Sequence, residues 1–150
     1  MQKETTYKNC FIDGPISSES IAKSIANHQK KTNIGAHQIF LGQVRADILN
    51  KKEVKSIHYS AHQEMANKIF YEIREDAFNK FNLTCMHIYH SLGIVNTGEI
   101  CLFVFASSKH RKEVQKAIEF LVEQIKEKAP IFGKEIFSDN THIWKKNDWY

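Results

Sequence analysis

The stretch that decides the fold is Ile100-Cys-Leu-Phe-Val-Phe-Ala106, followed directly by Ser107-Ser108-Lys109-His110-Arg111. An uninterrupted apolar run of this length predicts a central strand covered on both faces of a sheet, and it is too short to cross a bilayer. Ser107-Ser108 is expected to cap the next helix. That helix ends before Pro130, and its apolar face has helical spacing through Val114, Ala117, Ile118, Leu121 and Ile125.

Patterns before this stretch predict further strands and helices. Residues 1–16 read as an irregular or strand-like lead. Ser17 or Ser18 can cap a helix that carries Ile21 and Ile25 on its apolar face. Predicted strands cover residues 35–44, 54–59 and 83–92, with a polar loop at 47–52 and a turn at 96–98. A second helix over Gln63–Phe81 is expected to bury the residues that recur every four positions, Met65, Ile69, Ile73 and Ala77.

The elements predict one α+β domain over residues 1–150, a mixed or antiparallel sheet packed with about three helices. Short strands are expected after Pro130, around Phe132, Ile136, Phe137 and Trp144. The 42% hydrophobic and 25% charged content fits an ordinary globular protein. The polar N-terminus predicts neither a signal peptide nor membrane association, so a cytoplasmic protein is expected.

Cysteine and histidine patterns favour no metal and no cofactor. The three cysteines, Cys10, Cys85 and Cys101, form no CxxC pair, which argues against a disulfide framework or a zinc ribbon. Cys85 and Cys101 lie among apolar residues, as buried thiols do. His87 and His90 are expected on opposite faces of a strand, without an accompanying acidic or cysteine ligand set.

Three constellations could carry chemistry, and each has a purely structural alternative. His110-Arg111 opens a helix, where free N–H groups and a bidentate arginine can bind an anion; the alternative is a solvated helix start. Arg45 follows Gly42 on a strand end, which could admit a ligand or simply form an edge. Lys126 and Lys128 end the long helix, where they can complement its dipole or serve acid/base chemistry.

From about Gly35 to Trp144 the chain resembles the family of large, catalytic subunits of molybdopterin synthase. The order and spacing of several motifs match, although each alone would be weak. The motifs appear as Gly35-Ala36, Phe40-Leu-Gly-Gln-Val-Arg45, Ser108-Lys-His-Arg111, Lys126 with Pro130-Ile-Phe132, Lys134-Glu135 and Trp144. Two segments depart from the family pattern. The family reads P-I-W-K-K-E where this chain has Pro130-Ile-Phe-Gly-Lys-Glu135, so Gly133 stands in place of a lysine, and its Y-E-A-Y segment appears as Tyr59-Ser-Ala-His62.

The resemblance implies an α/β-hammerhead fold and a sulfur transfer. A small ubiquitin-like partner, thiocarboxylated at a C-terminal Gly-Gly, would supply two sulfurs to cyclic pyranopterin monophosphate and so form the dithiolene of molybdopterin. Lys126 would be the main acid/base residue and Lys134 its helper. The implied substrate-binding residues are Gln43, Val44, Arg45, His110, Arg111, Lys126, Gly133, Lys134 and Glu135, supported by Phe40 and Gly42.

Helix geometry and the resemblance together predict a homodimer within a heterotetramer. Arg111 and Lys126 lie about 22 Å apart along one helix at 1.5 Å per residue, too far for both to touch one pterin, so a second copy is expected to complete the site. Because Gly133 replaces a lysine, an alternative interpretation is a catalytically weakened paralogue that retains only the partner interface. A net charge of +4 keeps open a basic RNA-binding module, although the chain has no RNP-type motif and no nucleic acid is expected.

Overall fold

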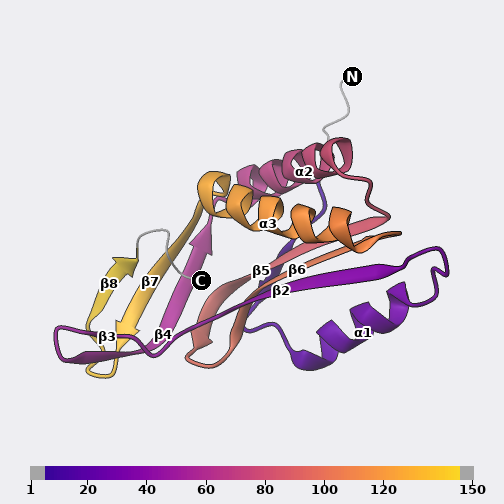
Figure 1. The fold of residues 1–150 in the computed structure, drawn as a ribbon. Coiled ribbons are helices and arrows are strands. Elements are labelled where there is room, and N and C mark those ends of the chain that lie inside the picture. The colour runs from indigo at the N-terminus through magenta and orange to yellow at the C-terminus, as the bar shows by residue number, and fades with distance from the viewer. Residues whose placement is uncertain (1–5, 146–150) are drawn as a thin grey trace, which may run out of the picture.

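The computed structural model describes residues 6–145 as an α+β domain with three helices (Figure 1). The helices are α1 (Ser18–His28), α2 (Gln63–Lys80) and α3 (Arg111–Lys128). The strands are β1 (Phe11–Asp13), β2 (Ala36–Gln43), β3 (Ile48–Leu49), β4 (Lys52–Ala61), β5 (Cys85–Asn96), β6 (Ile100–Ser108), β7 (Ile131–Phe137) and β8 (His142–Lys145). The predicted fold class is confirmed.

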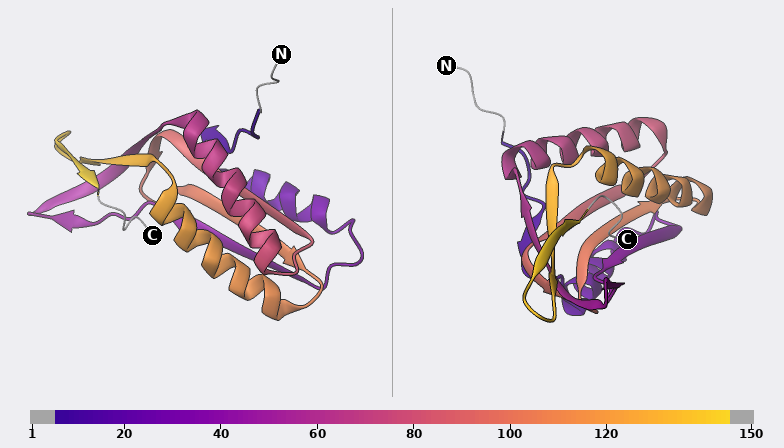
Figure 2. Two further views of the ribbon diagram at one scale, coloured as in Figure 1. Left: turned by 90° about the horizontal axis from the view of Figure 1, so that it is seen from above. Right: turned by 90° about the vertical axis from the view of Figure 1, so that its left-hand side faces the viewer.

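The strands form one sheet in the order β2-β6-β5-β4-β7-β8. Its pairings are antiparallel except for β1, which lies parallel to β5. β5 joins the two halves of the sheet, because its first residues pair with β6 and its last residues pair with β4. The outer half, β3, β4, β7 and β8, extends away from the helices (Figures 1 and 2); it is called the wing below and comprises residues 48–61 and 131–145.

The predicted central strand β6 is buried on both faces. Phe103 and Phe105 pack with Ile21 of α1. Leu102, Val104 and Ala106 point the other way, into a core shared with α2 and α3. Figure 1 shows α1 on one side of the sheet and the other two helices on the opposite side. Period-two alternation along β6 therefore supplies two cores at once.

Two local predictions are wrong. In α2 the predicted Ile73 and Ala77 are buried and Ile69 is partly buried, but Met65 is 57% exposed, and Ala66 and Phe70 complete the buried face. A spacing of four drifts around a helix that turns every 3.6 residues, so the buried stripe follows the mixed spacing of three and four. Ser107 and Ser108 do not cap α3. They belong to β6, and the N-cap is His110, which makes no side-chain cap hydrogen bond.

The remaining predictions of element positions hold with small shifts within residues 6–145, and the start of the predicted lead, residues 1–5, lies outside the described residues. Ser17 caps α1 by accepting a hydrogen bond from the Ser20 N–H at 3.1 Å. The predicted polar loop at 47–52 contains the short strand β3, and its turn places Asn50 and Lys51 at positive φ. In the part of the chain that is described, no helix is long and apolar enough to cross a membrane.

Candidate functional site

Four charged side chains, called the ion cluster below, gather where the loop after β2 meets the wing. Arg45 and Asp47 belong to that loop, and Glu135 and Lys145 belong to the wing. Lys145 Nζ lies 3.4 Å from Glu135 Oε1 and 3.7 Å from Asp47 Oδ2. Arg45 Nη2 donates a hydrogen bond to that same Asp47 oxygen at 3.2 Å. Arg45 and Lys145 therefore contact the same carboxylate. Asp47 and Lys145, which sequence reasoning missed, link the two predicted site residues Arg45 and Glu135.

Strand register explains why Lys145 reaches Glu135. In the β7–β8 pair, Lys145 lies directly opposite Gly133. Opposite residues of an antiparallel pair share a face, and so do residues two apart on one strand. Gly133, Glu135 and Lys145 thus lie on one face of the wing, the face that also carries Tyr59, the β4 partner of Gly133.

The ion cluster runs from the interior to the surface. The side chains of Glu135 and Lys145 are 3% and 8% exposed, whereas that of Arg45 is 51% exposed. Glu135 Oε2 is buried and has no hydrogen-bond partner among residues 6–145. Burial of a carboxylate is costly unless a cation is paired with it, and Lys145 supplies that cation.

Lys134 lies on the opposite face of β7. Neighbouring residues of a strand point to opposite faces, and Lys134 is opposite Trp144 in register. Its Nζ lies 5.8 Å from the centre of the Trp144 ring. The structure therefore separates Lys134 from the face that carries Gly133, Glu135 and Lys145.

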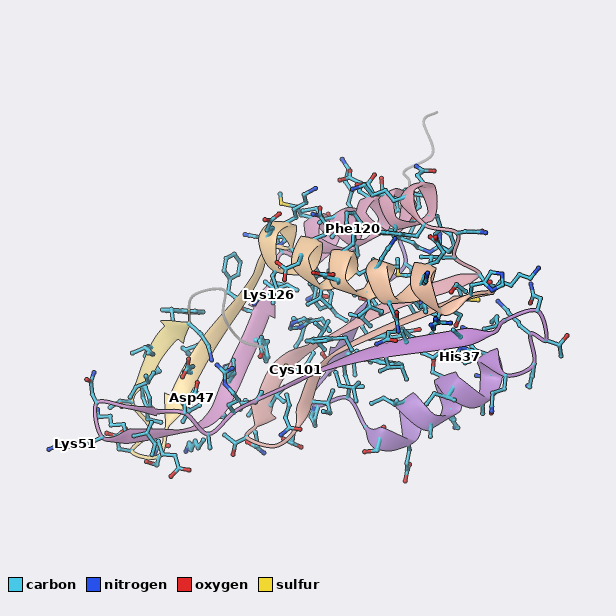
Figure 3. The ribbon with its side chains drawn as sticks, viewed as in Figure 1. His37, Asp47, Lys51, Cys101, Phe120 and Lys126 are labelled. Carbon is cyan, nitrogen blue, oxygen red and sulfur yellow. The ribbon has the colours of Figure 1, made fainter. Side chains whose placement is uncertain are left out.

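Lys126 is half-buried in the last turn of α3. Figure 3 shows it at the end of α3 that lies above β4 and β7, with Asp47 farther along the wing. The loop Ala129–Pro130 connects this end of the helix directly to β7, which carries Gly133 and Glu135. The helix end and the ion cluster are thus brought to the same half of the molecule.

His110 and Arg111 lie at the other end of α3. An 18-residue helix separates them from the wing, so one chain does not unite them with Lys126. A close approach fixes the turn that carries them: the N–H of Gly35 donates to Ser108 O at 3.0 Å, and a Cβ on Gly35 would come within 2.1 Å of Lys109 O. Only glycine fits there, which gives a physical reason for the Gly35-Ala36 motif.

The predicted strand-end residues also have clear positions. Val44 is buried, and its N–H donates to Glu99 O at 3.1 Å. The β2–β6 register shifts between Gly42 and Gln43, a bulge of the kind that redirects a strand end. Cys101 Sγ lies 3.3 Å from Gly42 O. Phe40 packs at the edge of the core shared with α2 and α3.

Where the two halves of the sheet meet, burial lowers or raises the pKa of the titratable side chains in the direction that favours their uncharged forms. His90 is fully buried and its ring lies 5.0 Å from that of Tyr59. Burial lowers the pKa of His90 to about 4, against a hydrogen bond from the ring to Ser91 O that raises it. Burial raises the pKa of the Cys101 thiol, while a hydrogen bond with Tyr59 and the charge of Lys145 lower it. His87 has a pKa of about 4, chiefly because of burial and then the charge of Lys8.

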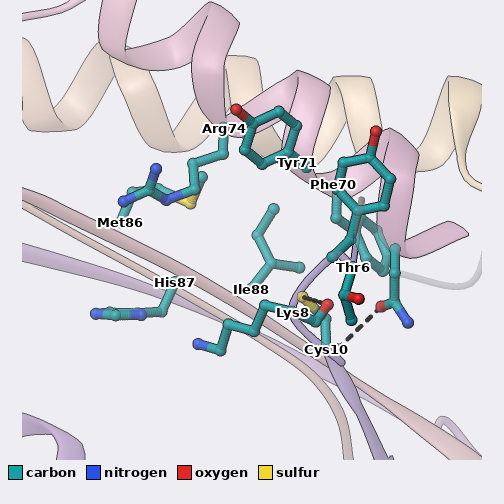
Figure 4. Close-up of a pocket in the computed structure, with 11 residues that line it drawn as sticks. Thr6, Lys8, Cys10, Phe70, Tyr71, Arg74, Met86, His87 and Ile88 are labelled. Atoms are coloured by element: carbon teal, nitrogen blue, oxygen red, sulfur yellow. Dashed lines mark hydrogen bonds between the residues drawn. The ribbon is translucent and has the colours of Figure 1, made fainter. Parts of the chain in front are cut away.

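One cavity, away from the predicted site residues, has a volume of about 390 Å³ (Figure 4). Lys8, Tyr71, Arg74 and His87 are among the side chains around it, and none of the predicted site residues lines it. Within the described residues, no group of three or more His, Cys, Asp or Glu side chains could hold a metal ion.

Asp47 and Lys145 were missed because neither belongs to a motif of the resemblance. Lys145 follows Trp144 directly in the sequence, and alternation along a strand that contains Trp144 would have placed the two on opposite faces. Nothing local, however, shows that Lys145 lies opposite Gly133, since that register depends on how β7 and β8 pair.

The fold and the site define a class of protein, an α+β domain with an antiparallel sheet. Its motifs place cations at a strand end, at a helix start and at a helix end. The family model described as MoaE protein matches residues 12–128. The chain belongs to this family, the catalytic subunits of molybdopterin synthase, an enzyme of molybdenum cofactor biosynthesis.

Relatives agree with this assignment. The chain is 33% identical over 117 residues to the molybdopterin synthase catalytic subunit of Pyrococcus abyssi, covering 78% of both proteins. It is 35% identical over 139 residues to that of Drosophila melanogaster, covering 91% of this chain but only 36% of the longer relative.

Solved structures agree as well. The molybdopterin synthase of Staphylococcus aureus superposes with a TM-score of 0.78 at 30% identity, covering 90% of this chain and 94% of that one. A complex of subunits 1 and 2 of the Helicobacter pylori molybdopterin-converting factor gives a TM-score of 0.78 at 21% identity, covering 93% and 91%, a likeness of fold.

Proposed function

We propose that this chain transfers sulfur from the thiocarboxylated C-terminus of a small ubiquitin-like partner to cyclic pyranopterin monophosphate, forming the dithiolene of molybdopterin. Arg45, His110 and Arg111 bind the anionic precursor, assisted by the residues next to Arg45, Gln43 and Val44. Lys126 is the main acid/base residue. Two lysines near Gly133 are candidates for its helper, Lys134 on the same strand and Lys145 on the neighbouring one.

The observation that supports a separate sulfur donor is that all three cysteines of the chain are buried. Cys10, Cys85 and Cys101 are free and buried. Burial raises the pKa of the Cys10 and Cys101 thiols, and a protonated, inaccessible thiol is a poor sulfur carrier. A reaction that installs two sulfurs therefore draws them from another molecule. Free thiols also suit a reducing compartment such as the cytoplasm.

A partner with a flexible Gly-Gly tail fits this chemistry. Glycine has no side chain, so such a tail can enter a narrow channel toward Lys126 and Arg45. The Helicobacter pylori complex of two subunits, which shares the fold, supports a pairwise assembly. Reconstitution with the thiocarboxylated small protein and the precursor is expected to yield molybdopterin, detected by mass spectrometry. A folded pair that binds at tens of micromolar and makes no product would identify a weakened paralogue; absence of binding would contradict the partner itself.

We further propose a homodimer, within a heterotetramer, whose second copy brings His110-Arg111 beside Lys126. The two motifs lie at opposite ends of α3, about 22 Å apart along its axis. Arg111→Ala and Lys126→Ala proteins are each expected to be inactive alone and to recover activity after verified subunit exchange. Exchange without recovery would mean that both residues act within one chain.

A further inference from the structure

Lys145 is a buried cation of the wing and has no part in the motifs discussed above. Its side chain is 8% exposed, between Glu135 and Asp47. An ammonium group has three N–H donors. Among the residues that the structure describes, the carboxylates of Glu135 and Asp47 lie 3.4 Å and 3.7 Å from the Lys145 Nζ. Contacts with two carboxylates hold the ammonium group at a fixed place.

The cation has a geometric relation to Gly133. Directly opposite residues of an antiparallel pair have their Cβ positions about 5 Å apart and share a face, and the register pairs Gly133 with Lys145. A lysine stem is longer than that separation. Lys145 therefore lies on the face that a side chain at position 133 would share, and its ammonium reaches Glu135 on that face. Lys134 points to the other face and lies against Trp144.

The cluster also reaches the strand end that carries Arg45. Arg45 and Lys145 contact the same oxygen of Asp47, and Arg45 is half-exposed. An anion that bridges these two cations would meet one at the surface and one in the interior. The unpartnered Oε2 of Glu135 lies beside the same ammonium and leaves a hydrogen-bond acceptor open to a ligand N–H or O–H group.

We propose that Lys145 is the second lysine of the substrate site, binding the anionic precursor together with Arg45 in the place that the motif leaves empty at Gly133. Lys134 does not have this role. The assignment rests on the proposed sulfur transfer to cyclic pyranopterin monophosphate and adds to it one substrate-binding residue and its carboxylate partners, Glu135 and Asp47.

The test uses the full chain in complex with its thiocarboxylated partner. Lys145→Met removes the charge and keeps the bulk. It is expected to raise KM and the calorimetric Kd for the precursor about 10- to 100-fold, the effect of a lost charge-assisted hydrogen bond, with the affinity for the partner unchanged. Lys145→Arg is expected to stay within a few-fold of the wild type. Lys52→Met is the matched control, because Lys52 also pairs with a carboxylate in the wing but is exposed.

A double variant that moves the lysine from β8 to β7 distinguishes substrate binding from a purely structural role of Lys145. In the double variant Gly133→Lys with Lys145→Met, the lysine moves to the opposite strand on the same face, and at least tenfold of the lost affinity is expected to return. A purely structural ion pair would instead lower the unfolding midpoint and leave the precursor Kd unchanged in Lys145→Met.

Specific results would overturn the assignment. Wild-type precursor affinity in Lys145→Met would do so, as would a loss that neither Lys145→Arg nor the double variant relieves. Loss of precursor affinity in Lys134→Ala alone would return the role to Lys134. A wild-type complex that binds the precursor but forms no product would overturn the proposed function instead, and the affinities of the variants would still decide the role of Lys145.

Discussion

The helix-covered half of the molecule and the wing bury different kinds of side chain. In β6 the buried residues are apolar apart from Ser107 and Ser108. In the wing, Glu135 and the Lys145 side chain are both almost fully buried, while Phe132, Ile143 and Trp144 are exposed. A buried ion pair contributes little net stability compared with apolar residues of the same volume. The difference indicates that the first half holds the fold together, and it agrees with the binding role proposed above for the wing.

The largest expected effect is on catalysis, at the helix that joins the two halves. Lys126→Ala should lower the rate of product formation about 10²- to 10⁴-fold, because it removes the proposed main acid/base group. The free energy of unfolding should change by less than about 1 kcal/mol, since a half-buried lysine at a helix end contributes little stability. Single-turnover assays and denaturant unfolding measure the two. A loss of activity accompanied by a matching loss of unfolding free energy would contradict a catalytic rather than a structural role for Lys126.

The same helix provides the matching test of the core. Leu121→Ala should lower the free energy of unfolding by about 2–5 kcal/mol, because Leu121 is fully buried against the sheet and its truncation leaves a cavity. Below its unfolding transition the variant should keep nearly wild-type activity. Denaturant unfolding measures the effect, and a loss under about 1 kcal/mol would show that the core is not the stabilising half.

Acid should destabilise the junction between the halves. The pKa of His90 falls from 6.5 to about 4 on burial, so between these values the unfolded state binds a proton that the folded state does not. Stability from His90 is therefore present above pH 6.5 and is lost as the pH falls toward 4, by on the order of 3 kcal/mol. Unfolding curves at pH 7, 5 and 4 measure this loss.

A matched histidine pair checks that prediction. His90→Gln should flatten the pH dependence, whereas His58→Gln, at an exposed position of β4, should leave it unchanged. If both variants keep the wild-type slope, groups other than His90 control the acid transition, with His87 the next to test because burial also lowers its pKa to about 4.

The smallest effect is expected on the outer face of the wing. Trp144→Ala should cost no more than about 1 kcal/mol of unfolding free energy, because Trp144 is 61% exposed and contributes mainly its cation–π contact with Lys134. Thermal unfolding measures it. A loss of several kcal/mol would show that the wing also carries part of the stability of the fold.

The sequence by itself determined the elements whose signals are local. The apolar run of β6, the buried stripe of α3, the Ser17 cap of α1 and the turn at 96–98 all depend on neighbours within a few residues, so propensity and periodicity were enough. The family motifs also lie within such short segments, which is why Arg45, His110, Arg111 and Lys126 could be proposed as site residues without a structure.

Only the tertiary structure decided how these segments meet. The face that α2 buries depends on what packs against it, so Met65 is exposed although it fits the pattern of every fourth residue. The neighbourhood of Lys145 depends on the β7–β8 register and on the path of the loop that carries Asp47. Register is a property of two strands together, and a shift of one residue would send Lys145 to the other face. No pattern along a single segment encodes that choice.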